Sequence, residues 1–308
     1  MSQERRGYVF AVVAYLSWGF FPIYFKHLLP SGAIEILAHR VVWSLLFIVL
    51  LVSVARGWPS VWRLRHDPRR LGLAALAAAL IAVNWGVYIY AVNAGQIVET
   101  SLGYFINPLV MVGLGVVVLS ERLRPAQWAA LGIGLVAVVV LTVDYGRLPY
   151  IALTLAASFS LYGLTKKRLA MPAADGLLIE SAVLALPCLV YVGVLMANGD
   201  STFGQVSVGH TVLLVLSGAI TAIPLLLFAG AANRITLSAI GLLQYLAPIL
   251  QLGLGVLLYK EPMPPARLAG FTLVWLALIV FTWDGVRHVR TRTRSNRSSA
   301  VPLKAPAA

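Results

Sequence analysis

Long apolar runs, separated by short polar and basic segments, make up most of this chain. A helix that crosses the hydrocarbon core of a bilayer needs roughly 20 mostly apolar residues. The pattern therefore predicts ten transmembrane helices, at 7–27, 34–55, 71–93, 98–119, 125–143, 149–166, 176–197, 209–231, 237–259 and 265–284. The runs are continuously apolar, which argues against a transmembrane barrel with its alternating polarity.

The second half of the chain repeats the first. The stretch 108–144 returns without a gap at 248–284, a shift of 140 residues that aligns Pro108 with Pro248, Gly113 and Gly115 with Gly253 and Gly255, Glu121 with Glu261, Pro125 with Pro265 and Asp144 with Asp284. We interpret the chain as two copies of one unit, 7–144 and 149–284. Five helices per copy is an odd number, so the second copy enters the membrane from the opposite side. Inverted repeats of this kind are typical of secondary transporters.

Composition excludes a soluble protein. Hydrophobic residues make up 60% of the chain and charged residues 11%, and the mean hydropathy is +0.86. Polar side chains this scarce could not cover the surface of a soluble protein of this length. The expected fold class is an all-α membrane protein.

Basic residues predict the orientation. If both termini lie in the cytoplasm, 19 of the 24 lysines and arginines lie in cytoplasmic segments, as the positive-inside rule requires. Contact of these residues with anionic headgroups accounts for the net charge of +13 without a nucleic-acid partner. The basic segment 285–308 is expected to be a cytoplasmic tail, disordered at its end.

Polar and aromatic side chains at membrane depth are the candidates for a substrate site, because uncompensated polar groups are costly in hydrocarbon. The expected cavity is lined by Trp18, Asn84, Tyr88, Tyr104, Asn107, Gln244, Tyr245 and Gln251. Gln244 and Gln251 are seven residues apart and should share one helix face. Tyr104 and Gln244 are equivalent in the two repeats. For each single residue, interhelical hydrogen bonding without a ligand is the alternative.

Three ionisable residues within the predicted spans are candidates for gating or proton coupling: His39, Arg40 and Glu180. Such residues are rare inside membranes and are usually functional. Arg40 and Glu180 occupy equivalent positions in the two repeats. The alternative is that each reaches its own interface or pairs locally, as Lys166 would allow for Glu180.

No motif indicates catalysis, a cofactor or a metal. The chain has no GxxxxGK[ST] phosphate loop, no HExxH, no GxSxG and no Cys/His cluster. We expect a protein that is not an enzyme and that uses a gradient of solute or ions. A proton is a candidate coupling ion, and facilitated diffusion is equally compatible. Two alternatives are an intramembrane enzyme using Glu35, His39 and Glu180, and a membrane sensor that transports nothing.

The expected partners are a small-molecule substrate and the lipid bilayer. The predicted spans 125–143 and 265–284 are mostly aliphatic and should face lipid or a second protomer. A monomer and a homodimer are therefore both compatible with the sequence.

Several segments resemble the EamA-type RarD transporters of the drug/metabolite transporter superfamily. They are Tyr15–Pro22 (YLSWGFFP), Glu35–Arg40 (EILAHR), Asn84–Tyr88 (NWGVY), Leu102–Leu109 (LGYFINPL), Leu242–Pro248 (LLQYLAP) and Tyr259–Pro262 (YKEP). The resemblance covers about residues 7–284. It implies ten helices in two inverted five-helix EamA units, a bacterial inner-membrane permease, and efflux of a small metabolite or drug-like solute. Members of this family are named for chloramphenicol sensitivity, which says little about the substrate.

Overall fold

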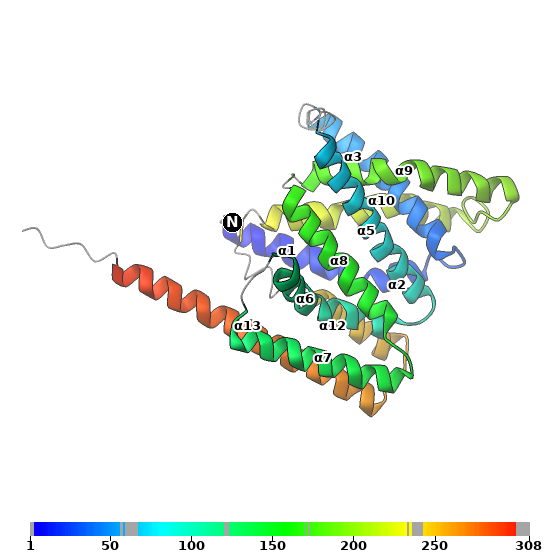
Figure 1. Ribbon diagram of the computed structural model, residues 1–308. Coiled ribbons are helices and arrows are strands. Elements are labelled where there is room, and N and C mark those ends of the chain that lie inside the picture. Colours follow the sequence, from blue (N-terminus) through cyan, green and yellow to red (C-terminus); the bar gives the residue numbers. More distant parts are fainter. Residues whose placement is uncertain are drawn as a thin grey trace, which may run out of the picture.

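The computed structural model describes residues 3–55, 58, 67–119, 123–169, 171, 173–232, 234–235 and 243–299. These residues form helices and connecting turns, with no strand among them (Figure 1). The helices are α1 (Gln3–Gly19), α2 (Phe21–Lys26), α3 (Ala33–Val54), α5 (Pro68–Asn93), α6 (Ile97–Leu119), α7 (Pro125–Tyr145), α8 (Tyr150–Leu169), α9 (Ala173–Asn198), α10 (Val208–Ala232), α12 (Leu246–Gly253), the π-helix η1 (Leu254–Leu258) and α13 (Pro265–Ser299).

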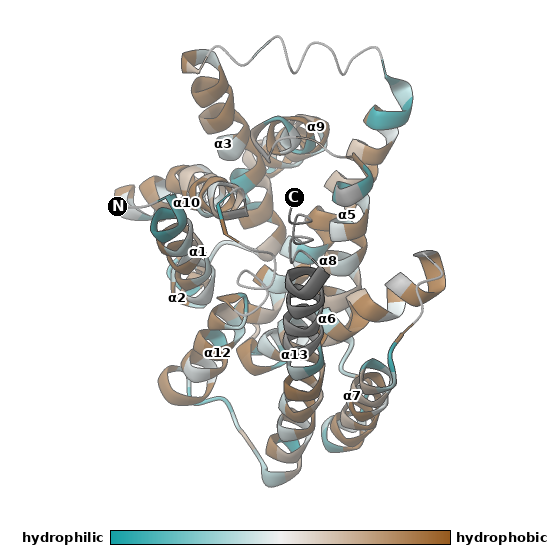
Figure 2. Ribbon diagram, turned by 90° about the vertical axis from the view of Figure 1, so that its left-hand side faces the viewer, coloured by the Kyte–Doolittle hydropathy of each residue, from teal (hydrophilic) through white to brown (hydrophobic). Residues whose placement is uncertain are grey.

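Eight candidate membrane spans are present in the part of the chain that the structure describes. The sixth predicted span is the helix α8, which is less apolar than these eight. The ninth contains the shorter apolar helix Leu246–Leu258, and its beginning, 237–242, lies outside the described residues. Ten spans and the placement of both termini in the cytoplasm therefore stay predictions. Figure 2 shows that most helices are strongly apolar, as contact with lipid requires.

The first predicted span is broken into two helices. Helix α1 ends at Gly19 and α2 begins at Phe21, with Pro22 in the first turn of α2. Proline has no N–H to donate to the carbonyl four residues earlier, and its ring disfavours a continuous helix. The break therefore leaves the carbonyl of Trp18 without its usual helical donor.

Helices α7 and α13 form a pair beside the other helices (Figure 1). Arg267, at the start of α13, pairs with Asp144 at 2.9 Å, and Arg124, before α7, pairs with Asp284 at 2.7 Å. These ion pairs lie at the two ends of the helix pair. The two helices are the least buried of the eight candidate spans, which agrees with their predicted contact with lipid. Helix α13 continues past the predicted span to Ser299, and residues 300–308 lie outside the described residues.

The other helices pack around a common core. Helix α8 packs on α5 and α6, α1 packs on α10 and α12, and α3 lies between α9 and α10. Two glycines permit close approaches of one helix backbone to another. A Cβ at Gly103 would lie 2.9 Å from the carbonyl oxygen of Ala152, and a Cβ at Gly218 would collide with the backbone of Trp43. Small residues at such crossings let helix backbones touch.

Five short connections meet at one end of the molecule, which we call the loop end: 27–32, 94–96, 146–149, 199–207 and 259–264. The sequence predicts this end on the outer side of the membrane. Hydrogen bonds join its connections directly. Ser31 Oγ lies 2.6 Å from Thr202 Oγ1, and Arg147 Nη2 donates to Gln96 Oε1 at 3.4 Å.

Candidate functional site

Asn84 and Tyr88, one turn apart on α5, meet Tyr104 of α6 in the core. Asn84 is 1% exposed, and its Nδ2 donates to the carbonyl of Leu155 and to Ser158 Oγ, both at 3.0 Å. The Tyr104 hydroxyl donates to Asn84 Oδ1 at 3.3 Å. The Tyr88 and Tyr104 rings lie 5.8 Å apart. The structure thus brings three of the predicted cavity residues together where α5, α6 and α8 meet.

Arg40 of α3 lies in an aromatic cage near this cluster. Its guanidinium carbon is 4.5 Å from the ring centre of Trp85, 5.1 Å from that of Phe25 and 5.7 Å from that of Phe21. Its Nε donates to Thr221 Oγ1 of α10 at 3.0 Å. Cation–π contacts of this kind offset part of the cost of burying a guanidinium.

Asn107 of α6 lies in a separate contact with α8. Ser160 Oγ donates to Asn107 Oδ1 at 2.5 Å and approaches the Asn107 carbonyl at 3.3 Å. Both side chains are buried. This pair joins α6 to α8, one turn along α6 from Tyr104, whose contact with Asn84 joins α6 to α5.

Gln251 of α12 contacts Trp18 at the break in the first span. Its Nε2 donates to the Trp18 carbonyl at 3.1 Å, the group that Pro22 leaves without a helical donor. Gln251 Oε1 is buried without a partner among the described residues. The Trp18 ring lies against Tyr15 and Phe228, at 5.4 and 5.8 Å.

Gln244 and Tyr245 are placed differently from the prediction. Gln244 lies in a turn before α12, which begins at Leu246, so it does not share a helix face with Gln251. Tyr245 stacks on Phe105 at 6.5 Å, in the apolar cluster that α6 forms with α7 and α13. The helical register that the spacing assumed is absent at Gln244.

His39 lies beside the α9–α10 connection at the loop end. Trp43 Nε1 donates to His39 Nδ1 at 3.3 Å, and the imidazole stacks on Phe203 at 4.9 Å. Its Nε2 is buried without a partner among the described residues. One turn earlier, Glu35 Oε1 accepts from the backbone N–H of Thr202 at 2.7 Å. These contacts hold the connection 199–207 against α3.

Glu180 of α9 pairs locally. Its carboxylate accepts from Lys166 Nζ at 2.7 Å and from the Tyr162 hydroxyl at 3.1 Å, both on α8. Arg40 and Glu180 are thus equivalent in sequence but have different partners in the fold. Glu35 and Glu180 likewise bind different elements, so the three groups of the enzyme alternative do not form one cluster.

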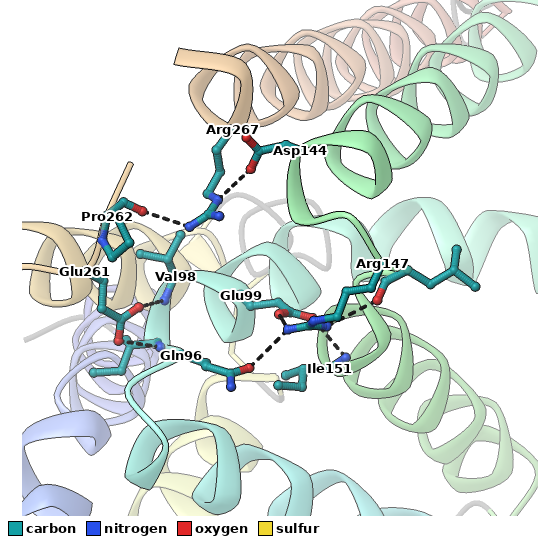
Figure 3. A network of polar contacts seen from close by, with 11 residues as sticks. Gln96, Val98, Glu99, Asp144, Arg147, Ile151, Glu261, Pro262 and Arg267 are labelled. Atoms are coloured by element: carbon teal, nitrogen blue, oxygen red, sulfur yellow. Dashed lines mark hydrogen bonds and ion pairs between the residues drawn. The ribbon is translucent and has the colours of Figure 1, made fainter. Parts of the chain in front are cut away.

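Figure 3 shows a further polar contact, made by residues outside the predicted site. Glu261, in the connection before α13, accepts from the backbone N–H groups of Ile97 and Val98 at 2.7 and 2.8 Å. It therefore caps the N-terminus of α6, whose first N–H groups have no partner within the helix. Burial raises the pKa of the Glu261 carboxyl above its ordinary value, although these two N–H donors oppose the effect. Glu121, its equivalent in the first repeat, lies outside the described residues.

Glu99 makes a second contact of this type (Figure 3). It accepts from Arg147 Nη2 at 2.8 Å and from the backbone N–H of Ile151, at the start of α8, at 3.1 Å. The hydrogen bond with Glu99 raises the pKa of Arg147. The position of Glu261 in the turn before Pro265 indicates a capping role, but the helix that it caps begins more than half the chain away.

No group of three or more His, Cys, Asp or Glu residues that could hold a metal ion occurs in the part of the chain that the structure describes.

The chain is similar to known transporters. Residues 5–143 match the EamA-like transporter family. The chain is 53% identical over 301 residues to "Protein RarD" of Streptomyces exfoliatus, covering 98% of this chain and 95% of that one. It is 41% identical to "Uncharacterized transporter YojE" of Bacillus subtilis, covering 94% and 97%. A solved crystal structure with 20% identity matches at a TM-score of 0.58 over 91% of this chain and 98% of that one, which supports the fold alone.

Proposed function

The chain belongs to the RarD-type transporters of the drug/metabolite transporter superfamily, and from that premise we propose that it exports a small metabolite or drug-like solute by alternating access, without ATP. It is a multi-pass protein of the bacterial inner membrane. The matching family and the Bacillus subtilis relative are named as transporters, and the role we assign is transport rather than catalysis.

One feature of the packing supports alternating access most directly. The 140-residue shift relates α1 to α8, α3 to α9, α5 to α10, α6 to α12 and α7 to α13. If each helix is replaced by its equivalent in the other repeat, a helix–helix contact of the structure corresponds to another contact that is also present. The contact of α6 with α8 corresponds to that of α12 with α1, and the contact of α5 with α8 corresponds to that of α10 with α1. Likewise the contact of α10 with α3 corresponds to the contact of α5 with α9. This correspondence is what two inverted repeats, 7–144 and 149–284, would produce, and such halves can rock about a site between them.

We place the substrate site around Asn84, Tyr88 and Tyr104, where helices of both repeats meet. Asn107, Gln251 and Trp18 would extend it along α6 and α12, and Gln244 and Tyr245 would border it. Asn84 supports this assignment because its hydrogen bonds join α5 and α6 of the first repeat to α8 of the second. A substrate that displaced one of these bonds would change how the two repeats pack.

We assign gating to His39, Arg40 and Glu180. The loop end is joined across the repeats by Glu35 with Thr202 and by Glu261 with α6. These contacts would have to break for the site to open at that end. The Lys166–Glu180 pair lies toward the opposite end and stays within the second repeat. Proton coupling through His39 or Glu180 is part of the same proposal, and it predicts that flux responds to an imposed pH gradient.

Counterflow in proteoliposomes tests the proposal. Metabolite profiling of cells that overproduce the protein would first identify an exported solute. We expect labelled solute to enter faster when the vesicles are preloaded with unlabelled solute, because alternating access exchanges one for the other. Asn84→Ala and Tyr104→Phe should lower the exchange rate by about tenfold, the kinetic equivalent of one lost hydrogen bond. Flux without counterflow would contradict alternating access, and unchanged flux in both variants would contradict the site.

A further inference from the structure

Arg40 is a cation buried among the helices. Its side chain is 2% exposed, and no ion pair joins it to an acidic group among the described residues. The nearest acid on its own helix, Glu35, is bonded to Thr202 instead. Burying an unpaired charge is costly, so such a group is retained where a partner of opposite charge binds.

Three other basic residues that are at least partly buried have acidic partners. Arg147 pairs with Glu99, Lys166 pairs with Glu180 and Arg267 pairs with Asp144, at 2.7 to 2.9 Å. Arg40 differs from these three residues because its guanidinium lies against three aromatic rings and donates to one hydroxyl, with no ion pair among the described residues. The fold therefore supplies a carboxylate at each of those positions and omits it at Arg40.

Donors remain at Arg40 for a ligand. A guanidinium carries five N–H donors in a planar fork, and the hydrogen bond to Thr221 uses only the one on Nε. The hydroxyl of Tyr88 is buried, 3% exposed, and has no partner among the described residues. The Tyr88 ring packs on Phe25 at 5.9 Å, and Phe25 also contacts the guanidinium.

The surroundings favour a ligand with one negative charge and an apolar body. A single guanidinium balances a single charge, and its planar fork matches a carboxylate through two parallel hydrogen bonds. Phe21, Phe25 and Trp85 surround the cation, and the rings of Tyr88 and Tyr104 lie beside them. A dianion such as phosphate would keep an uncompensated charge in this apolar shell.

We propose that Arg40, with the hydroxyl of Tyr88, binds the carboxylate of a monoanionic substrate that has an apolar or aromatic body. This assignment rests on the proposed transport function and names its substrate class. It places the anion where α3 and α5 of the first repeat meet α10 of the second, since Arg40 contacts Trp85 and Thr221. The apolar part of the substrate would lie against the aromatic residues of the cage.

Thermal unfolding of the purified full-length protein in detergent, followed by tryptophan fluorescence, tests the site. The probes are acetate, benzoate and phenylacetate, each compared with its uncharged amide and with inorganic phosphate. We expect at least one carboxylate to raise the unfolding temperature saturably, while the amides and phosphate do not. Arg40→Met should abolish the shift, and Tyr88→Phe should weaken the apparent affinity by about tenfold because one hydrogen bond to a charged group is lost.

Tyr145→Phe is the matched control. Its hydroxyl is also buried without a partner among the described residues, and its ring also lies under a guanidinium, that of Arg267 at 4.1 Å. That arginine is paired with Asp144, so the control should keep the wild-type response. Arg40→Met should fold, since an apolar side chain of similar length suits an aromatic cage. Should it aggregate, Tyr88→Phe and Arg40→Lys give the same comparison.

Three outcomes overturn the assignment: equal shifts by acids and amides, a carboxylate shift that survives Arg40→Met, or no shift by any carboxylate. The counterflow experiment separates this result from the transport proposal. Exchange of an uncharged solute that is unaffected by Arg40→Met would keep alternating-access transport, but it would remove both the anion site and the gating role of Arg40. Arg40-dependent binding without any exchange would keep the site and remove the transport proposal.

Discussion

A single side chain can supply the hydrogen bond that a backbone carbonyl lacks where a helix is broken. Pro22 removes the donor for the Trp18 carbonyl, and Gln251, from the second repeat, supplies another at 3.1 Å. An unpaired carbonyl in an apolar interior costs about 1–3 kcal/mol. One amide side chain therefore joins the break between α1 and α2 to α12.

Replacing Gln251 with Met should lower the free energy of unfolding by about 1–3 kcal/mol, because the Trp18 carbonyl loses its partner. Denaturant unfolding in detergent would measure the change. The Pro22→Ala background is the matched comparison, since alanine restores an N–H at position 22. We expect a smaller cost of Gln251→Met there. Equal costs in both backgrounds would show that Gln251 acts by packing alone.

At the scale of elements, helix N-termini at the loop end are capped by acidic residues from distant segments. Glu261 caps α6, and Glu99 accepts from the first turn of α8 while binding Arg147. Negative charge near a helix N-terminus is favourable, and the side chain satisfies N–H groups that have no helical partner. These caps decide how α6 and α8 meet their neighbours.

The Glu261 cap predicts a pH dependence of stability. Because burial raises its pKa in the folded protein above the ordinary value of 4.5, the folded state binds the proton more tightly than the unfolded state. The stability from this group is therefore full below about pH 4.5 and is lost as the pH rises through the raised pKa. The unfolding temperature of the wild type minus that of Glu261→Gln should fall as the pH rises over that range and should then level off. A difference that rises with pH would show that the N–H donors outweigh burial.

At the scale of the whole molecule, polar contacts join the two repeats at the loop end. Glu35 binds the α9–α10 connection, and Glu261 binds α6, so each repeat contributes a carboxylate that the other repeat's backbone satisfies. Helices α7 and α13 add ion pairs at both ends of their contact. The two predicted repeats thus pack as one unit.

The predicted orientation can be checked by labelling single cysteines in a Cys188→Ala background. Leu148, exposed at the loop end, and Arg69, exposed at the start of α5, lie at opposite ends of the molecule. An impermeant maleimide added to intact spheroplasts should label Leu148→Cys, and should label Arg69→Cys only after the membrane is permeabilised. Cys188→Ala alone should stay unlabelled. The reverse pattern would invert the topology.

Parts of the site were predictable because they depend on local pattern. Polar residues at membrane depth must find partners, so Asn84, Tyr88, Tyr104 and Arg40 stood out among apolar neighbours, and the structure brings them together. Gln244 was misplaced because the prediction assumed a continuous helix, and the helix begins at Leu246. Spacing fixes a shared face only where the helical register is unbroken.

The sequence by itself determined that the protein is helical and embedded in a membrane. Its apolar runs are long enough to span a bilayer, and it has too few charged residues to cover a surface in contact with water. It also predicted the repeat, since prolines, glycines and acidic residues of 108–144 recur 140 residues later. Only the tertiary structure decided which charges are paired. Glu180 forms an ion pair with Lys166, whereas Arg40 lies against aromatic rings, although the two positions are equivalent in the predicted repeat. Partners in a folded chain come from elements far apart in sequence, and no local pattern specifies which of them will meet.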